Sequence, residues 1–559
     1  MKEQLEEALS RICLELFGLK ESVNLTRPDN DFGDLATNIA LKLAKKLEKS
    51  PKELAEQIKL KIEQTLISDV KQVTIAGPGF INLRLNNSCL VKEINADPLK
   101  IYDKQVCVVE YSDPNPFKVL HAGHLYTSIV GDGIANLVDL AGGETHRVNF
   151  GGDVGMHVAK AMWAIIRKLD GEIPEKLKDI AKTQRIDWLS SAYIEGNDAY
   201  LLDQYKQEII AYNKKIYKII EENDQDSDFA KIYWTCRQWS YDYFREFYKS
   251  LAINFEKYYP ESETSQVGLK TVKEHIGSVY ELSKGAVVFD GQKYDLHTRV
   301  FINSEGLPTY EAKEVGLIIK KWQDYHFDKS VVITGNDIIE YMKVVLKSIE
   351  QFEPELPKRT IHITHGIVKL SGGTKMSSRK GNILKATDII DLATKACLEI
   401  STSNNHQVVL GAIKYSFLKN KIGGDIIYDP NESVSLQGNS GPYLQYAHAR
   451  AKSILAKANL GVSKTLEEAD FDDNERQLVI KLSQYNEIIN LATAELKPHL
   501  ICNYLYELAQ IFNQFYENAK VINSSRQSIR LSLVAVYAQK LNSGLKLLGI
   551  TALDQMPKN

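Results

Sequence analysis

The chain has 559 residues and a mass of 63.1 kDa, more than one hydrophobic core usually serves, so the length predicts about three or four domains. Its 44% apolar and 25% charged residues indicate a folded protein, and a net charge of −3 argues against indiscriminate binding of nucleic acid, which needs a concentrated positive field. Without a run of roughly 18 apolar residues, and with Glu3, Glu6 and Glu7 where a signal peptide would be basic, we expect a cytoplasmic protein outside the membrane.

The first part of the chain predicts a small α+β domain. Apolar residues from Leu5 to Leu16 have helical spacing, and a second amphipathic stretch, 36–66, is broken at Ser50-Pro51. Two short β-like runs follow in 70–85, and Asp97-Pro98 is typical of a linker.

The middle part predicts a parallel α/β sheet. An apolar run at 106–111, a loop, and a helical pattern over 121–140 make the strand-loop-helix unit that opens such sheets. Residues 149–155 resemble the end of a second strand. After a helix-rich section, short β-like runs return at 287–289, 299–302, 331–334 and 361–363. We therefore expect the helix-rich section to be an insertion between two halves of one sheet.

The last part, after about Asp388, is helical in pattern to the end of the chain. Candidate helices cover 408–418, 443–455, 475–496, 503–516 and 527–548. An all-α domain is therefore predicted here.

A pair of histidines, in His121-Ala122-Gly123-His124, begins the helix that follows the first strand. Imidazoles three residues apart share a helix face, and Gly123 lets a flat base or ribose approach the backbone. A helix N-terminus also presents the positive end of its dipole to phosphates. The pair could therefore hold the triphosphate of ATP and stabilise its developing charge. A core or surface histidine pair is the alternative, since this short pattern often occurs by chance.

A basic segment much further along follows Ser371-Gly372-Gly373. It consists of Lys375, Met376, Ser377, Ser378, Arg379 and Lys380. Glycines favour a loop whose cations can swing over a pyrophosphate leaving group. A solvated basic surface loop is the alternative.

In their order and spacing, the two motifs resemble the signatures of class I aminoacyl-tRNA synthetases. Three longer strings narrow the resemblance to arginyl-tRNA synthetases. Glu110–Lys118 is similar to the segment that precedes the family's histidine signature, Gly438–Arg450 to its entry into the anticodon-binding helices, and Asp31–Asn38 to the start of its extra N-terminal domain. The resemblance spans nearly the whole chain.

The resemblance implies a fold and an activity. The fold is α/β, with a Rossmann-like parallel nucleotide-binding sheet in a class I catalytic domain (97–388, helical insertion about 168–285), a small α+β N-terminal tRNA-binding domain (1–96) and an all-α C-terminal anticodon-binding bundle (389–559). The implied enzyme is an arginine–tRNA ligase that activates L-arginine with ATP and transfers it to the 3′-terminal adenosine of tRNA(Arg), releasing AMP and pyrophosphate. ATP and Mg²⁺ are the implied cofactors, and we expect a monomer.

The resemblance also implies roles for individual residues. Catalysis would fall to His121, His124, Lys118 and Lys375, and ATP binding to Gly123, Met376, Ser377, Ser378, Arg379 and Lys380. Arginine would be held by Glu110, Asn115, Tyr310, Glu314 and Asp153. Acids suit this substrate because a carboxylate matches the planar guanidinium with paired hydrogen bonds.

The implied tRNA contacts are Phe32, Asn38, Tyr443, Gln445, Tyr446 and Arg450. In the C-terminal group, aromatic and cationic side chains would stack on single-stranded loop bases and contact phosphates. An aromatic stripe at helical spacing is, however, more often core. Tyr310 and Glu314, at i and i+4, could likewise be an ordinary exposed helix face.

Three positions depart from the family pattern. Glu314 stands where the family usually has Asp, Ile338 aligns with a family Gln near the guanidinium, and Val154 replaces a Trp. In addition, Ser378 occupies the last position of the K-M-S-K signature, and Lys118 stands where an upstream lysine of the family is thought to supply the missing charge.

Two other interpretations stay open: a class I synthetase for another amino acid, such as cysteine or glutamate, and a non-catalytic paralogue that only binds tRNA or a protein. The six cysteines lie far apart, without Cys-x-x-Cys or a nearby histidine at zinc-ligand spacing, so no metal site is predicted and a cysteine enzyme is disfavoured. A binding relic would have no need of His121, His124, Lys375 and Lys118.

Overall fold

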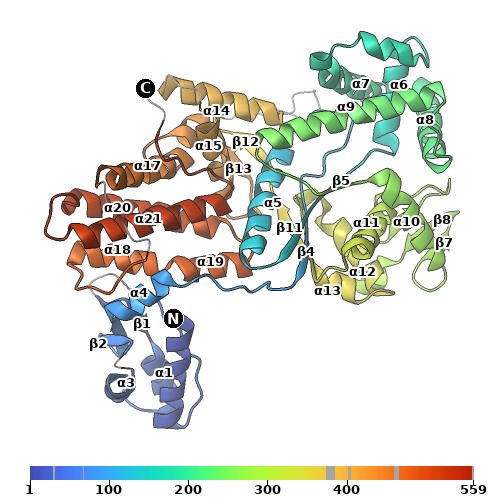
Figure 1. Ribbon diagram of the computed structural model, residues 1–559. Helices are drawn as coiled ribbons and strands as arrows, with labels where there is room; N and C mark the ends of the chain where they lie inside the picture. The colour runs from blue at the N-terminus through green and yellow to red at the C-terminus, as the bar shows by residue number, and fades with distance from the viewer. Residues whose placement is uncertain (29–31, 67, 373–383, 401–404, 459–464, 557–559) are drawn as a thin grey trace.

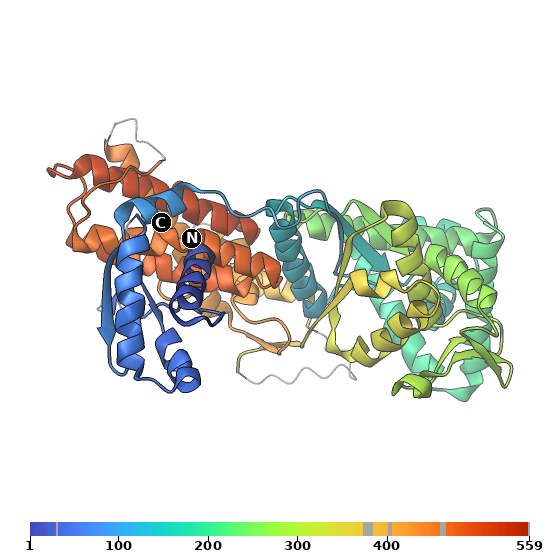
Figure 2. The ribbon, with the colours of Figure 1, turned by 90° about the horizontal axis from the view of Figure 1, so that it is seen from below.

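The computed structural model describes residues 1–28, 32–66, 68–372, 384–400, 405–458 and 465–556 (Figure 1). The molecule is elongated. Figures 1 and 2 show the N-terminal elements beside the C-terminal helices at one end, the insertion helices at the other, and the parallel sheet between them. No helix in the described ranges is long and apolar enough to cross a membrane.

Five parallel strands form the main sheet in the order β11-β10-β4-β5-β6. They are β4 (Val106–Glu110), β5 (Glu144–Gly151), β6 (Lys257–Pro260), β10 (Lys329–Gly335) and β11 (Thr360–His365). After β4, the chain adds β5 and β6 on one side of β4, and it later returns to add β10 and β11 on the other side. Such a switch point leaves a crevice at the carboxyl ends of the strands, where α/β proteins bind ligands. The expected parallel sheet is confirmed.

Helix α5 (Ala122–Leu140) covers the centre of this sheet. Cys107, Val108 and Val109 of β4 are buried in succession, as in strands covered on both faces. A Cβ added at Gly131 would lie 2.1 Å from Cγ of Tyr111. The absence of a side chain at Gly131 therefore lets α5 approach the end of β4 closely.

Between β5 and β6 lies a helical section. Its elements are α6 (Met156–Lys168), the 3₁₀ helices η2 (Pro174–Asp179) and η3 (Lys182–Gln184), α7 (Arg185–Tyr200), α8 (Asp203–Glu221) and α9 (Asp228–Ser250). These helices have a hydrophobic core of their own, which includes Met162, Leu189, Ile216 and Phe229. Strand β6, only four residues long, had no counterpart among the expected strands.

The β-like runs at 287–289 and 299–302 do not join the main sheet, contrary to our expectation. They belong to a separate antiparallel sheet of β7 (Glu281–Ser283), β8 (Ala286–Phe289) and β9 (Arg299–Ile302). Only Lys284 and Gly285, both with positive φ, connect β7 to β8. So short a turn allows antiparallel pairing alone, because parallel strands need a crossover of a dozen or more residues.

Four helices and a 3₁₀ helix lie between β6 and β11 in the sequence. They are α10 (Glu261–Glu274), the 3₁₀ helix η4 (Gly291–Tyr294), α11 (Tyr310–Tyr325), α12 (Ile339–Glu350) and α13 (Glu355–Arg359). A further 3₁₀ turn, η5 (Asn336–Ile338), follows β10 directly. Helix α11 begins at Tyr310, so Tyr310 and Glu314 lie one turn apart at its N-terminal end.

The C-terminal region is helical, as expected, apart from β13 (Ile426–Tyr428), which pairs in parallel with β12 (Val368–Leu370). Its helices are α14 (Ala386–Ile400), α15 (His406–Leu418), α16 (Pro430–Val434), α17 (Gly441–Ala458), α18 (Asp473–Ser483), α19 (Tyr485–Ala494), α20 (His499–Asn518) and α21 (Gln527–Leu547). The single helix expected over 475–496 is two helices, divided at Gln484.

The N-terminal region combines helices with an antiparallel sheet of order β1-β3-β2. Its elements are α1 (Lys2–Phe17), β1 (Leu35–Thr37), α2 (Ile39–Leu47), α3 (Pro51–Thr65), β2 (Val70–Ala76), β3 (Phe80–Leu85) and α4 (Asn87–Asn95). Pro51 is the first residue of α3, where its missing N–H costs nothing, which explains the break in the amphipathic pattern.

Candidate active site

A cavity of about 1460 Å³ opens at the carboxyl ends of β4, β10 and β11. Seven of the residues expected in the site line it: Glu110, Asn115, His121, Gly123, His124, Tyr310 and Glu314. They come from β4, the loop after it, α5 and α11. Residues as much as 204 positions apart in the sequence, Glu110 and Glu314, therefore meet at the predicted edge of the sheet.

The histidine pair forms the cap of α5. The backbone N–H of Gly123 donates to Nδ1 of His121 (3.1 Å), and the N–H of His121 donates to Nδ1 of His124 (3.2 Å). The two rings stack with centroids 3.7 Å apart. Because each Nδ1 accepts a hydrogen bond, a neutral ring must carry its proton on Nε2.

Both imidazoles are neutral at neutral pH. Burial, together with the nearby Lys118, lowers the pKa of His121 to about 4, and burial lowers the pKa of His124 well below its usual value. The pair therefore presents Nε2–H donors, not cations, to a ligand in the cavity.

Five residues with carboxyl side chains line the cavity, and three of them, Glu110, Asp113 and Glu314, interact electrostatically. Glu110 is paired with the fully buried ammonium of Lys321. Burial and the neighbouring Glu110 raise the pKa of Asp113 well above its usual value, although the N–H of Phe150 donates to its Oδ1 (2.8 Å). The attraction of Lys321 is therefore outweighed, for both Asp113 and Glu314, by burial and by the repulsion of Glu110.

Glu314 presents a carboxyl oxygen that could bind a ligand. Its side chain is buried, and Oε1 has no hydrogen-bond partner among the residues that the structure describes, while Oε2 lies 3.5 Å from the hydroxyl of Tyr341. Burial, with Glu110 as the next cause, raises the pKa of Glu314 to about 8. A buried, unpartnered carboxyl is costly unless a donor completes it, so this oxygen marks where a cationic ligand would be stabilised.

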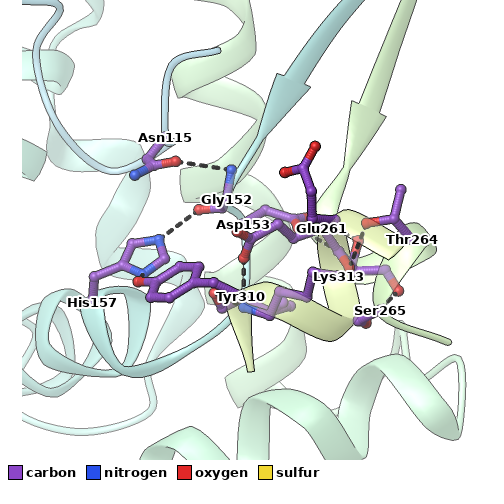
Figure 3. Close-up of polar contacts among 12 residues, drawn as sticks. Asn115, Gly152, Asp153, His157, Glu261, Thr264, Ser265, Tyr310 and Lys313 are labelled. Atoms are coloured by element: carbon purple, nitrogen blue, oxygen red, sulfur yellow. Dashed lines mark hydrogen bonds and ion pairs between the residues drawn. The ribbon is translucent and has the colours of Figure 1, made fainter. Parts of the chain in front are cut away.

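The turn after β5 links Asn115 to Tyr310 (Figure 3). Oδ1 of Asn115 accepts a hydrogen bond from the N–H of Gly152 (2.9 Å). His157, on the first turn of α6, contacts the carbonyl of Gly152 through Nε2 (2.7 Å) and the hydroxyl of Tyr310 through Nδ1 (3.4 Å). No pattern in the sequence marked His157 as a site residue.

Asp153 does not line the cavity. Oδ2 accepts from Nε of Arg237 (2.7 Å) and from Oγ of Ser262 (2.7 Å), and Oδ1 accepts from the N–H of Ser262 (2.8 Å). The carboxylate therefore ties the turn after β5 to α9 and α10. Among the departures from the family pattern, Ile338 lines the cavity and Val154 is fully buried.

Lys118 lies close to the histidine pair without lining the cavity. Its ammonium is 5.8 Å from the ring centroid of Tyr193 of α7, and burial lowers its pKa. The expected ATP-binding residues Lys375, Met376, Ser377, Ser378, Arg379 and Lys380 lie outside the described residues. Leu370 and Leu384, on either side of that segment, both line the cavity.

The residues expected to contact tRNA differ in exposure. Phe32 and Asn38, in the N-terminal region, are exposed. On α17, Tyr446 is exposed and stacks under Arg450, whose guanidinium also donates to Asn513 (2.9 Å).

The other two expected tRNA contacts on α17, Tyr443 and Gln445, form hydrogen bonds within the protein. Tyr443 accepts a hydrogen bond from the side chain of Asn513. Gln445 is buried, and its amide donates to the backbone carbonyls of Gln407 (3.1 Å) and Thr551 (2.8 Å).

Several further residues of the cavity carried no signal in the sequence. His365, at the end of β11, bonds Thr127 of α5 (2.6 Å), and Arg299 of β9 pairs with Glu311 (3.2 Å). Asp113 stands inside the string that includes Asn115, so its position could have been noticed. His157 follows the Gly152-Asp153 pair, but only the fold brings its ring to Tyr310.

Three family models match the chain. The model described as "tRNA synthetases class I (R), catalytic domain" matches residues 87–430, more than half of the chain, and its class is the one expected for this sheet and histidine pair. "Arginyl tRNA synthetase N terminal domain" matches 1–85, and "DALR anticodon binding domain" matches 444–556. The fold and site are those of a class I aminoacyl-tRNA synthetase. More narrowly, the chain belongs to the arginyl-tRNA synthetase family, which confirms the resemblance seen in the motifs.

Relatives and solved structures agree with this assignment. A protein named arginine–tRNA ligase from Porphyromonas gingivalis is 27% identical over 99% of both chains, and one from Clostridium perfringens is 28% identical over 99% of both. The fold is similar to that of the Thermus thermophilus arginyl-tRNA synthetase (TM-score 0.80, 23% identity, 100% of both chains) and of the Plasmodium falciparum arginyl-tRNA synthetase (0.77, 19%, 99% of both).

Proposed function

We propose that this chain is an arginine–tRNA ligase that forms arginyl-adenylate from L-arginine and ATP and then passes the arginyl group to tRNA(Arg). One observation carries the choice of arginine: the buried carboxyl of Glu314, one oxygen of which has no partner in the described part of the chain, faces the same cavity as the donors of the histidine pair. A guanidinium supplies both the positive charge and the paired N–H donors that this oxygen lacks.

In the first step, the carboxylate of arginine attacks the α-phosphorus of ATP, and pyrophosphate leaves. His121 and His124 donate from Nε2 to phosphate oxygens as negative charge develops. The nearby Lys118 and the segment from Lys375 to Lys380 add cations for the leaving pyrophosphate. In the second step, the 2′-hydroxyl of the terminal adenosine of tRNA attacks the adenylate carbonyl, and AMP leaves.

The arginine ligands divide between the two ends of the substrate. Glu110 and Asn115 hold the α-amino end, and Tyr310 and Glu314 hold the guanidinium. Asp153 contributes by fixing the turn that carries Gly152. Charge-assisted bonds of this kind contribute about 1.5–3 kcal/mol each, enough to reject a neutral analogue such as citrulline.

Mg²⁺ would accompany ATP. Within the described ranges there is no group of three or more acidic, histidine or cysteine side chains arranged to hold a metal ion. We infer that substrate phosphates and water would hold most of this ion, the usual arrangement for nucleotide-bound Mg²⁺. Bound there, it would neutralise phosphate charge.

The remaining parts of the proposal concern tRNA and the cell. Residues 1–96 form a tRNA-binding domain with Phe32 and Asn38 on its surface, 97–388 the catalytic domain, and 389–559 the anticodon-binding domain with Tyr446 and Arg450 exposed to RNA. Tyr443 and Gln445 support the same helix from within. The protein acts as a monomer in the cytoplasm.

The test is ATP–pyrophosphate exchange with each of the twenty amino acids in turn, with and without tRNA. We expect exchange to depend on arginine. Exchange supported by another amino acid, or by none while tRNA still binds, would replace this proposal by one of its rivals.

A matched variant tests the role of Lys118. Lys118→Met should lower the rate of adenylate formation much more than the affinity for arginine or tRNA, because the lost charge acts on the phosphates. Unchanged activation kinetics would remove Lys118 from the mechanism.

A further inference from the structure

Three of the proposed ligands of arginine, Asn115, Tyr310 and Glu314, are joined by one series of hydrogen bonds. It runs from Asn115 through both backbone groups of Gly152 to His157, and on to the hydroxyl of Tyr310 (Figure 3). From the backbone carbonyl of Tyr310 it continues through the hydroxyl of Tyr341 (2.8 Å) towards Glu314. Among the described residues, His157 is the side chain that bonds both to Gly152, which binds Asn115, and to Tyr310.

The direction of each bond follows from the carbonyl of Gly152. A carbonyl can only accept, so Nε2 of His157, 2.7 Å away, must carry a proton. In the neutral ring, Nδ1 is then an acceptor, and the hydroxyl of Tyr310 must donate to it.

The ring stays neutral throughout the working range of pH. Burial is the largest cause, and Lys313 and Lys118 act in the same direction, so that the pKa of His157 falls to about 3 although the bond to Gly152 opposes this. The ammonium of Lys313, itself paired with Glu261 (2.6 Å), lies 4.9 Å from the ring centroid of Tyr310.

The backbone is fitted to this contact. A Cβ added at Gly152 would lie 2.6 Å from Oδ1 of Asn115 and 3.1 Å from Nε2 of His157, so a side chain there would separate the two. Tyr310, in contrast, is 55% exposed, and among the described residues its hydroxyl forms a hydrogen bond with His157 alone. An exposed tyrosine would otherwise sample several rotamers.

We propose that His157 is a positioning residue for arginine: it accepts the hydroxyl proton of Tyr310 in a hydrogen bond, holds the tyrosine ring against the cavity, and couples it to the Asn115 end of the site. This inference rests on the proposed function only for the identity of the amino acid. His157 itself need not touch the substrate.

The experiment is a double-mutant cycle read by pyrophosphate exchange. His157→Phe keeps a planar ring but removes both bonds, and Tyr310→Phe removes the same contact from the other side. We expect each single change to raise the KM for arginine about tenfold, the value of one typical hydrogen bond, with the KM for ATP unchanged. The double variant should be no worse than His157→Phe alone, because the bond to Tyr310 is already lost in that variant.

Two further variants separate positioning from general damage. His157→Gln should restore most of the arginine affinity, since an amide can donate to Gly152 and accept from Tyr310. His275→Phe changes a histidine of α10 that bonds a backbone carbonyl (2.8 Å) away from the cavity, and should leave both KM values unchanged.

Multiplicative effects in the double variant, no rescue by Gln, or an equal rise of both KM values would overturn the inference. If His157→Phe does not fold, the KM for arginine of the other two variants decides: Tyr310→Phe should raise it, and His157→Gln should leave it close to that of the unchanged protein. Exchange driven by an amino acid other than arginine would refute the proposed function alone, and the cycle could then be run with that amino acid.

Discussion

Glu314 controls how arginine binding should depend on pH. With a pKa of about 8, raised by burial and by Glu110, this carboxyl is mostly protonated in the empty cavity at pH 7. A guanidinium needs the carboxylate, so binding must release the proton. Affinity should therefore rise with pH, by about tenfold per unit below 8, and level off above it. Calorimetry between pH 6 and 8.5, in buffers of different ionisation enthalpy, measures both the affinity and the proton release.

The matched variant is Glu314→Gln, which cannot titrate. It should bind arginine more weakly, by about 1.5–3 kcal/mol, and with a flat pH dependence. Asp113→Asn serves as the control, because Asp113 also has a raised pKa but already accepts a bond from Phe150. A pH slope that survives Glu314→Gln and disappears in Asp113→Asn would assign the proton to Asp113.

Short motifs predicted which residues line the cavity better than they predicted the hydrogen bonds around it. His121, His124 and Asn115 lie in local strings, and Tyr310 with Glu314 in one helical turn, so their residue types indicated their chemistry. The surroundings of Asp153 could not be read from the sequence. Its partners Arg237 and Ser262 lie 84 and 109 residues away, and only the folded chain brings them to it.

Helices α10 and α11 cross so closely that two glycines leave no room for a side chain beside the proposed arginine site. A Cβ at Gly268 would lie 1.8 Å from the carbonyl oxygen of Ala312, and one at Gly316 would lie 2.0 Å from that of Thr264. Gly316→Ala should force the helices apart, cost about 1–3 kcal/mol of stability, and displace Glu314. Thermal unfolding and the KM for arginine measure the two effects.

A glycine of α5 is the control for this substitution. A Cβ at Gly133 would meet its nearest neighbour, Leu418, at 3.4 Å, an ordinary contact. Gly133→Ala should therefore be neutral, or stabilise by up to about 1 kcal/mol through helix propensity. Equal tolerance of both substitutions would mean that the α10–α11 crossing is not tight.

Elements with a strong local pattern were predicted, and those that depend on pairing were not. The apolar run of β4 and the amphipathic helices were visible in the sequence. Strand β6 contains Tyr258 and Tyr259 in only four residues, too few for a period to show. The run at 287–289 has strand character in any sheet, and the two-residue turn before it determined its antiparallel partner.

For the whole molecule, the sequence predicted the parts but not their docking. The N-terminal elements pack against the C-terminal helices through contacts such as Asn486, which donates to the carbonyls of Glu93 (3.1 Å) and Ala96 (3.0 Å). The segments that meet are almost 400 residues apart, and the polar side chains that join them are typical of a solvated surface when seen alone. No local pattern could have paired them.

Arg476 of α18 places a buried charge at this junction. It pairs with buried Asp34 (2.7 Å) and donates to the carbonyl of Leu85 (3.1 Å). Arg476→Met leaves the buried carboxylate of Asp34 without its cationic partner. We therefore expect the docking free energy of the N-terminal region to fall by about 3–5 kcal/mol, with rapid proteolysis near residues 97–105. Arg27→Met removes a half-exposed ion pair with Glu487 across the same junction and should cost less than about 1 kcal/mol. Equal protease resistance of both variants would show that Arg476 does not hold the N-terminal region in place.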